Sequence, residues 1–311
     1  MSEEEKEYWQ KYIDNYISHT IGAVEYGNYF YDQIKDMVFS AKDDCDSILE
    51  KYIRCGTKKR YKELEKEIKE VLVGLEDEVA QFIALELPEL IENENQWLEN
   101  NVAPYLNINF DKVVNSVILL GMIPIATAGC ANNFGKNISN KLQSVYNQLI
   151  TQSYITDIPF DELEEDYSPR FSAFERGLQA DAETIGSSLS SQYDRIIFTK
   201  NDKKINRYLW TSILDTGTCL YCGSLDGQIF DDITKAPIYP PHNRCRCRLI
   251  PLPEDFSFED IRETYSEWLA RQDKATQYKA LGKTRFQLYE QGMKVKQFVN
   301  NGKITPLKNL K

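Results

Sequence analysis

The sequence of 311 residues contains only two histidines, His19 and His242, and this scarcity limits the chemistry available to it. Histidine is the side chain most often used for acid–base catalysis near neutral pH, and only His242 has other reactive groups near it in the sequence. The nucleophile elbow G-x-S-x-G, the P-loop and the dinucleotide fingerprint G-x-G-x-x-G are absent as well. We therefore expect a protein that is not an enzyme.

An apolar leader is also missing, because the first residues, MSEEEKEYWQ, are acidic, so we expect no secretory signal. One stretch, 113–135, carries no charge, but polar residues and Pro124 interrupt it. A membrane-spanning helix needs about 20 mostly apolar residues. We predict a buried core helix at 113–135, with membrane insertion as the alternative.

The net charge of −11 is unevenly distributed. The stretch from Leu269 to Lys311 has ten Lys and Arg against two Asp and Glu, a local charge of +8, so the rest of the chain carries −19. A basic end on an acidic body suggests a negative partner, such as nucleic acid or an acidic protein surface. The alternative is a solvated amphipathic helix with a frayed end.

Most of the chain has a helical pattern, clearest at 58–87, and Pro88 is predicted to end that helix. Its apolar stripe consists of Tyr61, Leu64, Ile68, Val71, Leu75, Val79, Phe82 and Leu85. We predict a mainly α protein with a small α+β C-terminal module. The expected divisions are a helical region at 1–153, a linker at 154–170, a helix and a Cys/His module at 171–255, and a basic helical segment at 256–311.

Strand formers appear after about Arg207. RYLWTSIL and CRCRLI indicate strands, and Asp226-Gly227 in SLDGQIF is typical of a type I′ hairpin turn. The expected result is a zinc-knuckle-like β-hairpin domain. A unit of roughly fifty residues has too little core to be stable alone, so it needs an additional link.

Five metal-ligating side chains fall in this unit, with the spacing C-x2-C, nineteen residues, then H-x2-C-x-C. The candidate ligands are Cys219, Cys222, His242, Cys245 and Cys247. This pattern favours a structural zinc site with four of the five as ligands. Disulfides and packed reduced thiols are the alternatives, although seven cysteines and the absent leader favour a reducing compartment. A redox centre is disfavoured because we expect the C-x2-C to precede a hairpin rather than a helix.

If CRCRLI is a strand, its cysteines share one face and its arginines the other. Arg244, Arg246 and Arg248 are therefore candidate contacts for nucleic acid or a protein partner. The alternative is a solvated face paired with local acids.

These residues resemble the C-terminal domain of the phage Mu F-like minor head proteins, also called head morphogenesis proteins. That domain has a Trp-bearing strand, an Asp, C-x-x-C, an LDG turn followed by an aromatic, and Pro-His-x-x-Cys-Arg-Cys. The matching residues here are Trp210, Asp215, Cys219, Cys222, Leu225, Asp226, Gly227, Phe230, Pro241, His242, Cys245, Arg246 and Cys247. The ending LGKTRFQLYEQG is similar too, so the resemblance covers about 205–311, whereas residues 1–170 show none. One departure is Asn243, where the family often has Pro.

The resemblance implies a minor capsid protein of a tailed phage, present in few copies inside the head near the portal. Such proteins act in head assembly, and in some phages they associate with DNA and influence its packaging or ejection. The implied partners are portal and head proteins and viral DNA, and the implied locations are the virion and, during assembly, the host cytoplasm. Two alternatives stay open: a toxin enzyme that carries a Mu F-like domain, and a zinc-knuckle nucleic-acid-binding protein.

Overall fold

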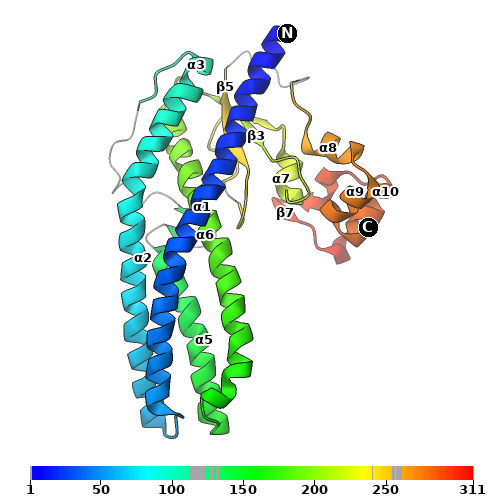
Figure 1. Cartoon of the computed structure of the whole chain (residues 1–311). Helices are drawn as coiled ribbons and strands as arrows, with labels where there is room; N and C mark the ends of the chain where they lie inside the picture. The colour runs from blue at the N-terminus through cyan, green and yellow to red at the C-terminus, as the bar shows by residue number, and fades with distance from the viewer. Residues whose placement is uncertain are drawn as a thin grey trace.

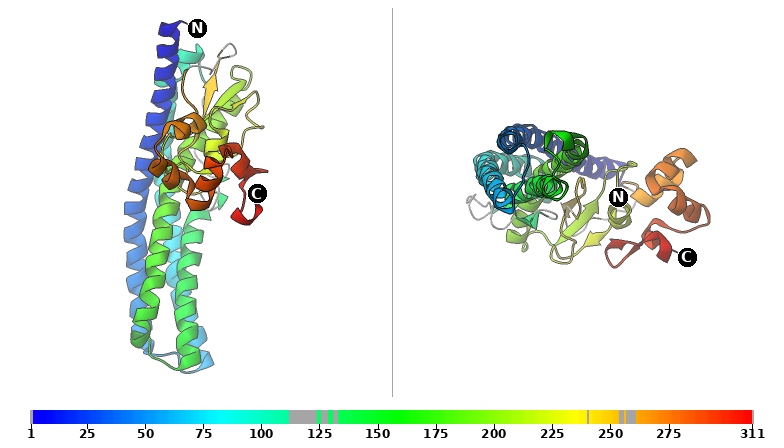
Figure 2. Two further views of the ribbon diagram at one scale, coloured as in Figure 1. Left: turned by 90° about the vertical axis from the view of Figure 1, so that its right-hand side faces the viewer. Right: turned by 90° about the horizontal axis from the view of Figure 1, so that it is seen from below.

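The structure, a computed structural model, describes residues 2–111, 124–125, 129–130, 133–239, 241–253, 256 and 261–310. Its body is an antiparallel bundle in which α1 packs against α2 and α6, and α5 closes the other side (Figures 1 and 2). The bundle helices are α1 (Glu3–Tyr52), α2 (Lys58–Asn101), α5 (Phe134–Thr156) and α6 (Glu164–Lys200). The expectation of a mainly helical chain with a few small strands is confirmed.

Helix α2 shows how the apolar pattern builds the bundle. Thr57 caps its first turn by accepting a hydrogen bond from the Arg60 backbone N–H. Most of the predicted stripe is buried or half-buried, but Leu85 is 78% exposed. The predicted end at Pro88 is wrong, since the helix continues to Asn101 with Leu90, Ile91 and Leu98 buried. Burial of this continuing stripe outweighs the cost of a proline inside a helix, which is about 3 kcal/mol.

Helices α1 and α6 approach each other closely where two glycines meet. A Cβ atom on Gly186 would lie 2.6 Å from the backbone N of Gly27, and one on Gly27 would lie 2.6 Å from the carbonyl O of Glu183. Distances this short leave no room for a side chain at either position. The two backbones therefore touch directly at this point.

Two predicted segments differ from the structure. Most of 113–135 lies outside the described residues, but Pro124–Ile125 (β1) and Gly129–Cys130 (β2) pair as short antiparallel strands instead of forming the expected helix. The expected linker at 154–170 is instead the end of α5, a turn with the 3-10 segment Asp161–Leu163, and the start of α6. A short turn suffices because α5 and α6 are antiparallel neighbours within the bundle.

The small module contains a sheet with the strand order β4-β3-β5, all antiparallel. Its strands are β3 (Arg207–Thr211), β4 (Ile229–Phe230) and β5 (Arg248–Leu252). The strand predicted at RYLWTSIL is confirmed. The predicted hairpin turn at Asp226-Gly227 is wrong, because α7 (Leu220–Leu225) occupies the expected first strand of that hairpin and the two residues follow its end.

The module shares its core with the bundle. Trp210, Leu249 and Ile250 are completely buried in the same apolar cluster that contains the helix residues Tyr12 and Ile34. The Tyr12 hydroxyl also donates a hydrogen bond of 2.8 Å to the carbonyl of Pro251. The module therefore obtains from the bundle much of the apolar core that its own length could not provide.

The basic C-terminal unit, residues 261–310, lies beside the module on the side away from the bundle (Figures 1 and 2). It is more than a frayed helix, because its buried side chains form an apolar cluster with Leu220 of α7. Its elements are α8 (Tyr265–Arg271), α9 (Lys274–Leu281), α10 (Lys283–Glu290), the 3-10 segment Val295–Phe298, β6 (Val299–Asn300), β7 (Lys303–Ile304) and the 3-10 segment Leu307–Asn309. Across the residues described, no helix has the length and apolar character that a membrane span requires.

Candidate metal centre

The five predicted ligands come from two segments that the sheet holds side by side. Cys219 is the N-cap of α7 and its sulfur accepts a hydrogen bond from the Cys222 backbone N–H, so both side chains project from one helical turn. His242, Cys245 and Cys247 lie in the loop that leads into β5, which pairs with β3 along its whole length. The structure therefore places all five predicted residues in one cluster, as the spacing indicated.

The cluster consists of two triads that share Cys222. In one triad, Nε2 of His242 lies 3.0 Å from Sγ of Cys219 and 3.2 Å from Sγ of Cys222. In the other, Sγ of Cys222 lies 3.7 Å from Sγ of Cys245, and Cys247 lies close to both. Within each triad the ligand atoms all lie within 4.8 Å of one another. These side chains could together hold a metal ion.

Hydrogen bonds from neighbouring groups orient the side chains of the cluster. Nδ1 of His242 donates to the backbone carbonyl of Asn243 at 2.8 Å, which directs Nε2 toward the sulfurs. Cys247 differs from the other four because its sulfur contacts the Ser212 hydroxyl at 3.3 Å. Cys222, Cys245 and Cys247 are buried, whereas Cys219 and His242 are partly accessible. An ion could therefore enter from the side of Cys219 and His242.

The electrostatics favour a cation in the cluster. Hydrogen bonds from Cys222 and His242, acting against burial, lower the pKa of the Cys219 thiol to about 4. The hydrogen bond to Cys219 raises the pKa of His242 to about 9. Contacts with Cys222 and Cys247 also lower the pKa of Cys245. Cys219 and Cys245 are therefore thiolates, the form in which cysteine binds metals. The neighbouring sulfurs raise the pKa of Cys222, and burial raises the pKa of Cys247. A metal ion would therefore displace a proton from Cys222 as well as the proton on Nε2 of His242.

The structure bears on two alternatives to a metal site, disulfide bonds and a redox centre. All six cysteines whose side chains are described are free thiols, and 3.7 Å between Cys222 and Cys245 is far longer than a disulfide bond of about 2.05 Å. The C-x2-C begins a helix rather than preceding a hairpin, so that argument against a redox centre was wrong. The helix was missed because its six residues are too few to show periodicity.

The three arginines do not form one basic strand face. Arg248 is completely buried, so the prediction of an exposed contact there is wrong. Arg246 forms a two-pronged ion pair of 2.7 Å with Asp215, and Arg244 pairs with Glu183 at 2.6 Å. Of the three, only Arg244 has a side chain that is largely exposed.

Arg248 is the centre of a buried polar network that sequence reasoning missed. Its Nε donates to Asp194 at 2.9 Å, and its Nη2 donates to Ser190 at 2.6 Å and to Glu94 at 3.4 Å. His19 donates from Nε2 to Glu94 at 2.9 Å. The network joins α1, α2 and α6 to β5, directly after the last candidate ligand. Its members are scattered from residue 19 to residue 248, so no local pattern reveals them.

Two buried carboxylates share the one guanidinium of Arg248, and their pKa values separate accordingly. Burial, only partly offset by Arg248, raises the pKa of Asp194 to about 6. Against burial, the hydrogen bond from His19 and the charge of Arg248 lower the pKa of Glu94. Oδ1 of Asp194 has no hydrogen-bond partner among the described residues. A proton on Asp194 would therefore be carried by Oδ1.

Asp226 holds the other end of the module together. One carboxylate oxygen accepts from the backbone N–H of Ser212 at 2.6 Å and the other from that of Tyr265 at 2.7 Å, and Arg262 pairs with both. These bonds connect the end of β3, the end of α7 and the start of α8. Asp226 therefore serves as a structural connection to the C-terminal unit and not as a hairpin turn.

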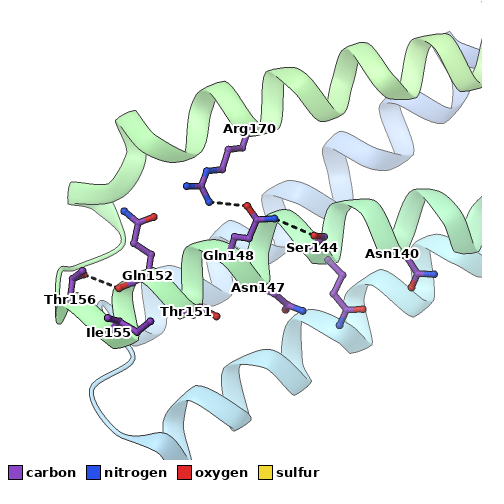
Figure 3. A pocket seen from close by; sticks show the side chains of 10 residues that line it. Asn140, Ser144, Asn147, Gln148, Thr151, Gln152, Ile155, Thr156 and Arg170 are labelled. Carbon is purple, nitrogen blue, oxygen red and sulfur yellow. Dashed lines mark hydrogen bonds between the residues drawn. The ribbon is translucent and has the colours of Figure 1, made fainter. Parts of the chain in front are cut away.

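Away from the Cys/His cluster, a surface hollow of about 600 Å³ lies along α5 and is lined mainly by amides and hydroxyls (Figure 3). Arg170 donates to Gln148 at 3.0 Å, and Gln148 donates to Ser144 at 3.3 Å. Arg170 is the one charged residue among those that line it. This hollow therefore offers no acid–base pair for catalysis.

Comparison of the chain with protein-family models, curated proteins and solved structures gives no match.

Proposed function

We propose that this chain is a minor capsid protein of a tailed phage, acting in head assembly near the portal. The observation that supports the proposal is the convergence of the residues that carry the resemblance to the Mu F-like proteins. Cys219, Cys222, His242, Cys245 and Cys247 meet in one cluster, while Arg246 pairs with Asp215 beside it. A motif whose residues hold the module together suits a structural role without catalysis.

The metal in the cluster is proposed to be zinc, with a structural role. Two sulfurs bound to one zinc ion in a tetrahedron are about 3.8 Å apart, close to the 3.7 Å between Cys222 and Cys245. The donor set of thiolates and one imidazole is typical of structural zinc. Cys219, Cys222, His242 and Cys245 are the proposed ligands, since Cys247 already contacts Ser212. Zinc would connect α7 to the loop before β5.

The basic C-terminal unit is proposed as the surface that meets an acidic partner in the head. Lys279, Lys283, Lys296, Lys303 and Lys308 are exposed. Lysine contacts with phosphates or acidic side chains are electrostatic, do not depend on base sequence, and weaken with salt. Portal protein and viral DNA both offer such a surface, and both would be met inside the virion.

The test is genetic disruption of the coding gene in a phage that carries it, with complementation by the intact chain. We expect particles without the protein to lose infectivity by at least about tenfold and to show incomplete or unstable heads, and mass spectrometry of complemented particles to find the chain in few copies per head. Normal heads with full infectivity, or purified heads that lack the chain, would overturn the proposal.

A further inference from the structure

The far end of the bundle contains a cavity that the proposed head function does not use. It has a volume of about 660 Å³ and lies where α1 turns into α2 and α5 turns into α6. Its apolar lining is formed by Leu49, Leu149, Phe160, Tyr167 and Phe171. A cavity of this size is within the range that accepts sizeable ligands or several side chains.

Ile53, on the rim of this cavity, has an unusual conformation. Its side chain is 65% exposed, and its backbone has a φ of +55°, a region that favours glycine. Its carbonyl accepts a hydrogen bond of 2.9 Å from the Phe160 backbone N–H, which ties the two turns together. A strained, exposed, β-branched side chain adds nothing to the stability of this end, so a role in binding accounts for it better.

Acidic residues surround the same cavity. Glu50 and Asp161 line it, and a second hollow that also includes Asp161 is lined by Glu162 and Glu165. All four are exposed, and none forms an ion pair within the part of the chain that is described. Lys42 and Asp46 also line the cavity, but they pair with each other. The site therefore combines an apolar floor with a rim on which Glu50 and Asp161 leave a net negative charge.

One segment of the chain has the complementary character. Ile304 is 40% exposed and Leu307 is 47% exposed, three residues apart, and Lys303 and Lys308 flank them. Both lysines are exposed and lack an ion-pair partner among the described residues. The segment 303–308 thus presents two apolar side chains between two positive charges.

We propose that the cavity at the far end of the bundle binds the segment 303–308 of a second copy of this chain. In Figure 1 the C-terminal unit lies beside the opposite half of the bundle, well away from the end where α1 turns into α2, so the contact joins two molecules. It pairs two different surfaces, and repetition therefore gives a ring or an open filament instead of a closed dimer. The inference stands independently of the proposed phage function.

The first experiment is sedimentation velocity of the full chain over a range of concentrations, after nuclease treatment to remove nucleic acid. We expect concentration-dependent association that weakens by at least about tenfold between about 50 mM and about 500 mM salt. A monomer at every concentration, or association that nuclease treatment abolishes, would overturn the proposal.

Paired charge reversals then locate the contact. Glu50→Lys with Asp161→Lys reverses the cavity rim, and Lys303→Glu with Lys308→Glu reverses the segment. Each double variant alone should associate at least about tenfold more weakly than the parent, while an equimolar mixture recovers, because the positive rim meets the negative segment. The matched control, Lys62→Glu with Lys69→Glu on the exposed face of α2, should associate normally. No recovery in the mixture, with both variants folded by circular dichroism, contradicts the proposal.

Ile53→Gly separates binding from folding. Relief of the positive φ should raise the melting temperature, whereas loss of the side chain should weaken association by about tenfold. Unchanged association by a stabilised variant would remove Ile53 from the site and contradict the proposed contact.

Discussion

Two cysteines of the bundle, Cys45 and Cys55, and one cysteine of the module, Cys219, occupy opposite environments. Burial raises the pKa of Cys45 to about 12 and that of Cys55 to about 11, so both are neutral thiols that fill space among helices. Cys219, with a pKa lowered to about 4 by Cys222 and His242, is a thiolate. The same residue type therefore acts as an apolar filler at Cys45 and Cys55 and as a charged candidate ligand at Cys219.

The difference extends to how the two regions are stabilised. The bundle depends on many apolar side chains, each contributing a little, spread along stripes on α1, α2, α5 and α6. The module depends on a few polar centres: the Cys/His cluster, the Arg248 network and Asp226. Outside the contact of Gly27 with Gly186 and the bundle residues that bind Arg248, single substitutions should consequently be tolerated better in the bundle than in the module.

The largest expected effect comes from replacing Cys222, the residue common to both triads. Cys222→Ser should abolish metal binding and destabilise the module by more than about 4 kcal/mol, as loss of a structural metal typically does. Elemental analysis of protein purified without added metal, with thermal unfolding followed by tryptophan fluorescence, would measure both. Cys55→Ser, a buried bundle thiol near the Ile150 carbonyl, is the control and should retain the metal. Parent protein free of zinc, or a Cys222→Ser variant as stable as the parent, would contradict the expectation.

The next effect concerns the buried charges. Arg248→Met removes the guanidinium, which leaves Asp194 without a charged partner and Glu94 with only His19 and Ser190, and this should cost about 3–5 kcal/mol in denaturant unfolding. Arg244→Met removes an exposed pair with Glu183 and should cost less than about 1 kcal/mol. Equal effects of the two substitutions would mean that burial of the Arg248 network contributes little.

The smallest effect is a change in pH dependence. Because the pKa of Asp194 is raised to about 6, the folded state keeps a proton between about pH 4 and pH 6 that the unfolded state releases. Stability from this group is therefore present at lower pH and declines as pH rises through that window, by on the order of 3 kcal/mol. Asp194→Asn should flatten this decline in urea unfolding measured from pH 4 to pH 7. A difference between the two proteins that stays constant across the window would show that Asp194 is ionised throughout.

Local patterns predicted part of this structure well. The strand with Trp210, the long helices and the membership of the Cys/His cluster all follow from spacing within one segment. The sequence indicated β3 and the start of β5, but it placed a hairpin strand where α7 lies and put Cys245 and Cys247 in a strand instead of the loop before it.

The sequence could not indicate which residues surround Arg248 on β5. The prediction that CRCRLI is a strand throughout is wrong, since β5 begins only at Arg248. The arginine face was also assigned to solvent, whereas α1, α2 and α6 surround Arg248 with His19, Glu94 and Asp194. Likewise, Asp226-Gly227 has the composition of a hairpin turn, yet Asp226 binds backbone N–H groups from two distant segments. Contacts between residues far apart in the chain decided both cases.

The contact between Gly27 and Gly186 has a consequence for the metal centre, although it lies within the bundle. Gly186, Ser190 and Asp194 follow one another at four-residue intervals along α6, so they lie near one face of the helix. With the α1 and α6 backbones in direct contact at Gly186, α6 can neither rotate nor slide without a clash. Its fixed orientation determines where Ser190 and Asp194 hold Arg248, and Arg248 directly follows Cys247. The position of Cys247 in the candidate metal centre therefore depends in part on the distance between α1 and α6, which two glycines set because they have no side chains.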